Sequence, residues 1–365
     1  MKSGLMALAA GLGALMLGTA AQAADEWNPA AGPEWAKTLE AAKKEGVVVV
    51  AGHPQLTPKL TEAFQKDTGL NIQFFGGAAR ELDSRIKREL RAKQVTIDVM
   101  FGGASNLDMI PQGYLQELPP RLMLNEVTDP SKWRDGKLKY ADNAQKYLFI
   151  PNEYVFGWLA YNPTLVKPGE ITSWKDLLKP EYKGKIAAHD PRAPGPGLAY
   201  AAYLGELFDV DFVKKLYVGQ DAMLTTDSRQ LVDWVARGTY AFALSALPPF
   251  IQRYQAEKLN VAVMDMPDGP GSLIGGSSVV WIPAGAPHTN GATVFLNWYL
   301  SQHGQQVYSD IWQAPSRRVD VSTANVPDFV VPKPGVKYFD QYQEDWYLKT
   351  RPKLSEAIVE ATGGR

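Results

Sequence analysis

The sequence predicts an α/β protein of two lobes, each a doubly wound sheet, joined by two crossing strands. Three strand-like segments alternate with helical segments between residues 47 and 106, and a second alternation begins at residue 183. This βαβ order favours parallel sheets with helices on both faces. The 365 residues also exceed what a single hydrophobic core usually supports. Two lobes are therefore the expected organisation.

The first 23 residues have the pattern of a cleaved secretory signal peptide. Lys2 supplies a short positive region, residues 5–17 are apolar, and Ala21-Gln22-Ala23 has the small-x-small pattern of a cleavage site. The apolar run is shorter than the ~20 residues that span a bilayer. No cysteine follows Ala23, so we expect no lipid anchor. These features predict export from the cytoplasm, away from its ATP and NAD pools.

The composition excludes several classes of function. The chain has no cysteine, which rules out disulfides, thiol catalysis and thiolate zinc sites. With a net charge of −1, the chain has no excess of positive charge of the kind that binds nucleic acid. None of the histidines (His53, His189, His288 and His303) forms an HxxxH or HxH pair, so we expect no metal site and no cofactor.

We expect residues 24–155 to form the first part of lobe 1. The β-branched run at 47–50 suits a strand that is buried on both faces. Thr57 is expected to cap a helix over 58–66. The other predicted elements are strands at 71–75 and 97–101 and helices at 33–45, at 78–93 and from about Asn106.

Polar or glycine-rich loops follow the three predicted strands, at 52–57, 76–80 and 102–105. In doubly wound sheets, ligands bind outside the carboxyl ends of the strands, where helix N-termini offer free N–H groups. We therefore expect ligand contacts among the residues of these loops, namely His53, Gln55, Gly77, Arg80, Gly103, Ala104 and Ser105. Arg80 could equally be a solvated residue of the following helix.

We expect residues 156–272 to form lobe 2, residues 273–318 to return to lobe 1, and residues 319–365 to form a tail that packs on the lobes. The crossing strands are predicted in the aromatic stretch 147–162 and at 277–283. The other predicted elements are a short helix capped by Ser173, strands at 183–188, 223–225 and 240–244, and helices at 197–208, 228–237 and 290–303. Lobes joined in this way form a hinged cleft.

The loop at 189–197 contains a candidate for anion binding, Arg192. Its guanidinium could donate two parallel hydrogen bonds to a carboxylate or phosphonate, and the N-terminus of the following helix would add N–H donors. Asp190 and Gly195 lie in the same loop. A surface arginine in a proline-rich loop is an equal alternative.

Further candidates lie beside the crossing strands and at strand ends. Tyr154 could stack on a ligand or hydrogen-bond to it. Ser245 follows a lobe 2 strand, and Ser277 and Ser278 lie at the second crossing, where hydroxyls could meet a ligand. Asp227 could face the cleft, but a plain helix N-cap is the favoured interpretation.

Several segments resemble periplasmic solute-binding proteins of ABC importers, in the group of ferric-iron, thiamine and aminoethylphosphonate binders. They include DVMFGGASNLDMI, SWKDLLKPEYKGKI and NGATVFLNWYLSQHGQQ, and the resemblance covers essentially the whole chain after the signal. It implies a type II-like periplasmic binding protein fold that closes on a small anionic organic solute. It also implies a non-enzymatic, monomeric periplasmic protein that delivers this solute to an inner-membrane ABC permease.

The iron-binding members hold Fe³⁺ mainly through two adjacent tyrosines just after the strand that corresponds to 240–244. This chain instead has Ser245-Ala246-Leu247-Pro248-Pro249, which cannot supply the anionic oxygen donors that ferric iron prefers. His53 lies where iron binders often carry a ligand histidine, and Arg317 lies in a segment that resembles the cleft-edge loop. Ferric iron therefore remains the alternative solute. A periplasmic hydrolase is a further alternative, although the sequence has no GxSxG or HExxH motif.

Overall fold

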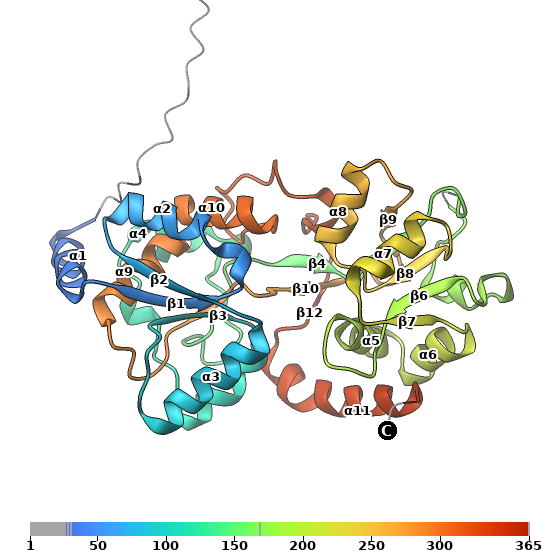
Figure 1. Ribbon diagram of the computed structural model, residues 1–365, viewed down its shortest axis with the longest axis horizontal. Coiled ribbons are helices and arrows are strands. Elements are labelled where there is room, and N and C mark those ends of the chain that lie inside the picture. The colour runs from blue at the N-terminus through green and yellow to red at the C-terminus, as the bar shows by residue number, and fades with distance from the viewer. Residues whose placement is uncertain (1–26, 28, 30, 168, 364–365) are drawn as a thin grey trace, which may run out of the picture.

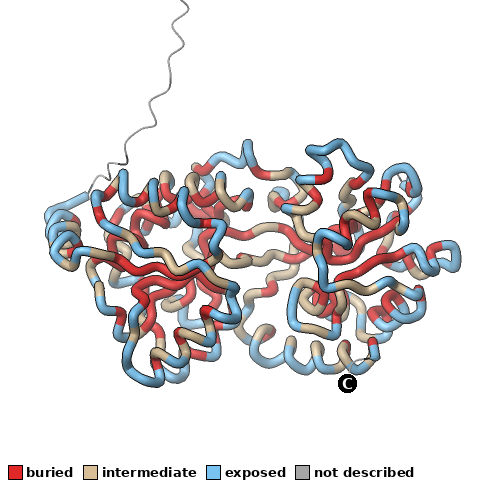
Figure 2. Tube along the Cα trace, viewed as in Figure 1, coloured by how far each residue is buried: buried red, intermediate tan, exposed pale blue. Residues whose placement is uncertain are grey.

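The computed structural model describes residues 27, 29, 31–167 and 169–363, which fold into two lobes joined by a narrow middle (Figure 1). The predicted signal peptide lies outside the described residues. The inner strands of both lobes are buried, whereas most exposed residues lie on the surrounding helices and loops (Figure 2).

Lobe 1 is built on a four-stranded mixed sheet with the order β11-β3-β1-β2. Its strands are β1 (Val48–Gly52), β2 (Ile72–Gly76), β3 (Val99–Gly102) and β11 (Val279–Trp281). β1 is parallel to β2 and β3, whereas β11 returns antiparallel to β3. All five residues of β1 are buried, which agrees with the prediction from its β-branched run.

Helices cover both faces of this sheet. Val48 and Val50 face one core with α1 (Pro33–Glu45), α2 (Lys59–Thr68), α9 (Thr289–Leu300) and α10 (Gln302–Trp312). Val49 and Ala51 face the other core with α3 (Ala79–Ala92) and the 3₁₀ segment η2 (Ala104–Gln112). Successive side chains of a strand point to opposite faces, so this alternation follows from the strand geometry.

Lobe 2 contains a five-stranded mixed sheet with the order β7-β6-β8-β5-β9. The strands are β5 (Leu159–Tyr161), β6 (Ile186–His189), β7 (Met223–Thr225), β8 (Phe242–Leu244) and β9 (Ala262–Met264). One face packs on α5 (Pro196–Leu207), α6 (Val210–Lys214) and α11 (Arg351–Ala361). The other face packs on α7 (Ser228–Ala236) and α8 (Pro248–Ala256).

A small third sheet lies between the lobes, with the order β12-β10-β4. It consists of β4 (Tyr154–Phe156), β10 (Ser272–Ile274) and β12 (Phe339–Asp340). The sequence predicts two crossing strands, but the tail adds β12 as a third. The segment predicted as the second crossing, 277–283, instead contains β11 of lobe 1.

Three local predictions differ from the structure. Thr57 ends a 3₁₀ turn, η1 (Pro54–Leu56), and Pro58 precedes α2, so Thr57 does not cap that helix. The segment from Asn106 is 3₁₀ rather than α-helical and has Pro111 inside it. The helix predicted at 290–303 ends at Leu300, and the Ser301 hydroxyl accepts the Gly304 N–H at 3.1 Å to begin α10.

The break between α9 and α10 requires glycine at position 304. A Cβ there would lie 2.0 Å from the carbonyl oxygen of Trp298. Any larger residue would therefore push the two helices apart. After this turn, α10 runs towards the middle of the molecule. The short helix α4 (Asn125–Thr128) also belongs to lobe 1.

Candidate functional site

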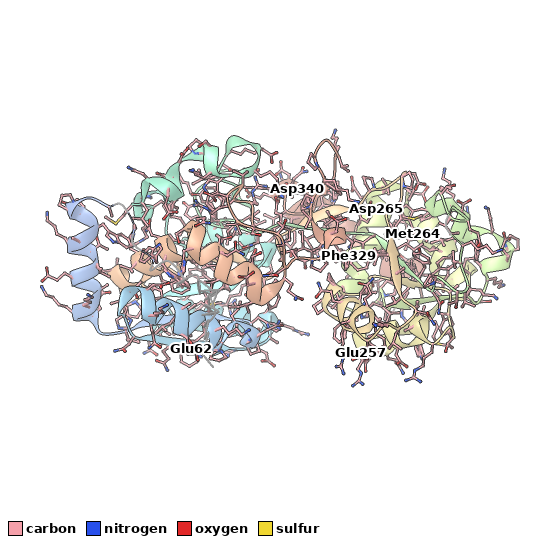
Figure 3. The ribbon with its side chains drawn as sticks, turned by 90° about the horizontal axis from the view of Figure 1, so that it is seen from above. Glu62, Glu257, Met264, Asp265, Phe329 and Asp340 are labelled. Carbon is pink, nitrogen blue, oxygen red and sulfur yellow. The ribbon has the colours of Figure 1, made fainter. Side chains whose placement is uncertain are left out.

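A cavity of about 330 Å³ lies between the two lobes. One wall comes from lobe 1 and contains His53, Gln55, Trp312, Gln313 and Ala314. The other comes from lobe 2 and contains Leu247, Pro248, Pro249, Phe250 and Gln252. Tyr154 of the crossing sheet and Val330 of the tail complete the lining. Seen from above, Glu62 of α2 and Glu257 at the end of α8 lie on opposite lobes (Figure 3).

The lobe 1 wall is organised around His53. Its Nδ1 accepts the backbone N–H of Gln55 at 3.2 Å, and its ring packs against Trp312 with centroids 4.8 Å apart and planes at 74°. Burial lowers the pKa of His53, so the ring is neutral near pH 7. Because Nδ1 is an acceptor, the neutral ring carries its proton on Nε2, which is left to donate to a ligand.

Gln313 follows the end of α10 in a left-handed conformation, with φ at +52°. Its backbone N–H donates to the Ser309 carbonyl oxygen at 2.7 Å and so closes the helix. Glycine would adopt this conformation without strain, and a glutamine does so at a cost. Such backbone strain is common at ligand sites. Here the strained residue, Gln313, has an exposed side-chain amide that lines the cavity.

The lobe 2 wall begins where β8 ends. Ser245 is buried with φ at +58°, and its carbonyl oxygen accepts a hydrogen bond from His189 Nδ1 at 2.8 Å. Leu247 then leads into α8, whose first two residues are Pro248 and Pro249. Proline has no N–H group, and the Phe250 N–H already donates to the Leu247 carbonyl oxygen at 3.1 Å. The first three residues of α8 therefore present an apolar surface and no free N–H group.

Tyr154 enters the cavity from β4. Burial raises the pKa of Tyr154 to about 12, so its hydroxyl stays protonated. A Cβ on Gly276 would lie 3.1 Å from that hydroxyl oxygen, and the positive φ of Gly276 also favours glycine. Together, His53, Gln55 and Tyr154 are the sequence-predicted residues that the structure brings to the cavity.

Arg192 and Asp190 pair with each other outside the lining of this cavity. The Nη2 of Arg192 lies 2.6 Å from Oδ2 of Asp190, and its Nε lies 2.8 Å from Oδ1. Hydrogen bonding from Arg192 lowers the pKa of Asp190. Gly195, at the end of the same loop, precedes α5. The Arg192 guanidinium is therefore already paired with the carboxylate of Asp190.

The other predicted residues of the strand-end loops also lie outside the lining. Gly77 donates its N–H to the Gly52 carbonyl oxygen, and Arg80 is exposed on the first turn of α3. Ser105 hydrogen-bonds to Asp83 at 3.0 Å. Gly103 and Ala104 pass beside the crossing sheet, where a Cβ on Gly103 would lie 3.6 Å from the Tyr342 hydroxyl.

Two of the remaining candidates, Asp227 and Ser278, make internal hydrogen bonds. Asp227 accepts the N–H groups of Arg229 and Gln230 at 2.8 and 3.0 Å, as the N-cap interpretation predicts. Ser278 is buried and bonds to the Gly275 carbonyl oxygen at 2.7 Å, and Ser277 beside it is half-buried.

Arg317 lies in a buried cluster of charges around Glu153, the residue before β4. It pairs with Glu153, which also pairs with Arg134 and Lys139. Burial alone would raise the pKa of Glu153, but these three cations hold it at about 2. Arg317 is 1% exposed and therefore has a structural position.

Sequence reasoning missed most of the cavity wall, including Trp312, Phe250, Gln252 and Gln313. These residues belong to the helix ends of two lobes that are far apart in the sequence. The only local signal was Pro248-Pro249 directly after a strand, which marks a helix start without free donors. Among the described residues, no group of three or more His, Asp or Glu side chains is arranged to hold a metal ion.

Comparisons with known proteins identify the family. A sequence model of the bacterial extracellular solute-binding proteins matches residues 59–327. An uncharacterized protein of Haemophilus influenzae is 31% identical over 285 residues, covering 73% of this chain and 75% of that protein. The spermidine/putrescine-binding periplasmic protein of Escherichia coli is 25% identical over 279 residues (75% and 66%). The Fe(3+)-binding periplasmic protein of Serratia marcescens is 23% identical over 339 residues (88% and 91%).

Solved structures share the fold. The substrate binding protein of an ABC transporter from Agrobacterium tumefaciens superposes with a TM-score of 0.66 at 19% identity, covering 89% of this chain and 96% of its own. Iron-bound HitA from Pseudomonas aeruginosa superposes with a TM-score of 0.62 at 18% identity (87% and 99%).

The chain has the fold of the periplasmic binding proteins, with a cavity between its two lobes. The chain belongs to the bacterial extracellular solute-binding protein family. It is therefore an extracellular solute-binding protein, and members of this family are not enzymes. None of the helices in the described part of the chain is long and apolar enough to span a membrane.

Proposed function

We propose that this protein captures a small organic solute between its lobes by hinge closure and delivers it to an inner-membrane ABC permease. The cavity, whose walls come from both lobes and from the crossing sheet, carries this proposal. A solute that contacts both walls binds the closed form more tightly than the open form, so it shifts the equilibrium towards closure. His53, Gln55 and Tyr154 are the predicted residues that we propose as contacts.

The proposed location is the periplasm, where the protein would act as a monomer after signal cleavage and without a lipid anchor. The signal pattern of the first 23 residues supports this location. The Escherichia coli and Serratia marcescens relatives are both described as periplasmic.

An anionic solute is the expectation from the sequence, and it depends on Arg192. Such a solute would have to displace Asp190 from the Arg192 guanidinium when the lobes close. On this expectation, Arg192→Ala weakens binding of an anionic solute more than tenfold in titration calorimetry. Unchanged affinity would remove Arg192 from the site.

Ferric iron remains an alternative because His53 and Tyr154 both reach the cavity. Iron binding by Tyr154 would require a tyrosinate, and burial raises the pKa of Tyr154 to about 12, which opposes its ionisation. The purified protein is therefore expected to stay colourless with Fe³⁺. A red-to-orange charge-transfer band would make iron the favoured solute.

The experiment that tests solute binding is a thermal-shift screen of carboxylates, phosphonates, polyamines, thiamine, uncharged ring amides and Fe³⁺. A ligand at 100 times its Kd adds ~2.7 kcal/mol to the free energy of unfolding. One class is expected to raise the unfolding midpoint. If no member of any class does so, the proposed role fails.

A further inference from the structure

We propose that the cavity selects an uncharged solute with an apolar body and a hydrogen-bonding edge, about the size of one substituted ring. This inference rests on the proposed solute-binding role and replaces its anionic solute with an uncharged one. It follows from the kind of polar groups in the cavity, from the start of α8, and from the cavity volume.

Every polar side chain of the lining is uncharged near pH 7. The lining holds the neutral imidazole of His53, the phenol of Tyr154, and the amides of Gln55, Gln252 and Gln313. The side-chain amides of Gln252 and Gln313 line the cavity, where each can donate to a solute and accept from it. Gln55 donates to the Ile311 carbonyl oxygen at 3.4 Å, which leaves its own carbonyl oxygen as an acceptor.

The same lining disfavours a charged solute. No carboxylate, ammonium or guanidinium of the described residues lines the cavity. An anion would also find no free N–H group on the first three residues of α8, because Pro248 and Pro249 have none and that of Phe250 donates to Leu247. Moving a charge from water into a site without a counter-charge is strongly unfavourable. An uncharged solute avoids this cost and can still hydrogen-bond to the amides.

The apolar part of the lining and the cavity volume define the body of the solute. Leu247, Phe250, Trp312 and Val330 provide aliphatic and aromatic surface. A volume of about 330 Å³ lies near the lower end of the range of small-molecule sites, roughly 300–1,000 Å³. A solute as compact as one substituted ring suits a cavity of this size.

Probes that share one ring and differ only in charge test this proposal. The two sets are benzamide, benzoate and benzylamine, and nicotinamide, nicotinate and 3-(aminomethyl)pyridine. We expect the uncharged amide of at least one set to bind at least tenfold more tightly than its anion and cation in titration calorimetry at pH 7. The proposal is overturned if a charged member binds as tightly as its amide, or if neither amide binds at 10 mM.

A substitution that places a charge in the cavity should change this preference. Gln252→Glu is expected to weaken the amide at least tenfold and to make the cation the tightest member of its set. Gln255→Glu is the matched control, because Gln255 lies on the same helix, is exposed and does not line the cavity. Equal effects of the two substitutions would overturn the proposal, since they would reflect only a change in surface charge.

The two proposals fail in different ways. If another solute of the thermal-shift screen stabilises the protein while both ring amides fail, solute binding stands and the uncharged ring class is wrong. If no solute of either panel binds, the solute-binding role itself fails.

Discussion

At the scale of single residues, Glu153 shows how one buried carboxylate connects separate parts of the chain. It pairs with Arg134 and Lys139 from lobe 1 and with Arg317, and Lys139 also lies 2.6 Å from Asp340 of β12. The residue after Glu153 is Tyr154, which lines the cavity. The charge cluster therefore fixes both the crossing sheet and one cavity residue.

The stability contributed by Glu153 should depend on pH. Its pKa is about 2 in the folded protein, below the ordinary value of 4.5. Its stabilisation is therefore fully present above about pH 4.5 and is lost as the pH falls towards 2. The shift corresponds to about 3 kcal/mol.

Glu153→Gln removes the charge and leaves Arg317 buried without its carboxylate. We expect the variant to lose about 3–5 kcal/mol of unfolding free energy at pH 7, measured by urea denaturation. The difference from the parent protein should shrink by pH 3, because Glu153 is then mostly protonated in the unfolded state and must lose that proton on folding. An equal difference at both pH values would contradict the role of the carboxylate charge.

At the scale of elements, the sequence predicts what local patterns determine. Helix α1 and strand β7 have the predicted bounds, and the Ser173 cap before Trp174 is observed. β12 was missed because its two residues have no strand pattern of their own and pair only where the tail meets β10. The cavity was predicted only in part, since His53 follows a strand in an obvious loop whereas Trp312 and Phe250 meet through tertiary packing.

Two substitutions of Asp227, the N-cap residue of α7, distinguish a structural role from a role in ligand binding. Asp227→Ala removes the acceptor of two backbone N–H groups and is expected to cost about 1 kcal/mol of stability. Asp227→Asn keeps an acceptor and should cost less. Both variants should bind solute with unchanged affinity in calorimetry, and a loss of affinity in both would place Asp227 in the binding site.

At the scale of the whole molecule, the lobes are joined by three strands and by a tail that contacts both of them. Phe329 packs on Trp158 of lobe 2 with ring centroids 5.1 Å apart, between the lobes as seen from above (Figure 3). The adjacent Val330 lines the cavity. Any closing motion must therefore bend all three crossing strands together.

Hinge closure can be measured directly because the chain has no cysteine. Spin labels on Glu62→Cys and Glu257→Cys would report the distance across the mouth of the cleft, because the two exposed residues lie on opposite lobes. We expect a bound solute to shorten this distance. A pair at Glu40 and Glu62, both on lobe 1 helices, is the control and should not change. An unchanged distance across the mouth with solute bound would contradict closure.

The distribution of each core along the chain has a consequence for secretion. β11 and helices α9 and α10 complete lobe 1 after residue 278, and Ile358 of α11 is fully buried in the core of lobe 2. A chain exported behind the predicted signal peptide crosses the membrane from its N-terminus onwards. Neither lobe can finish folding until nearly all of the chain has emerged.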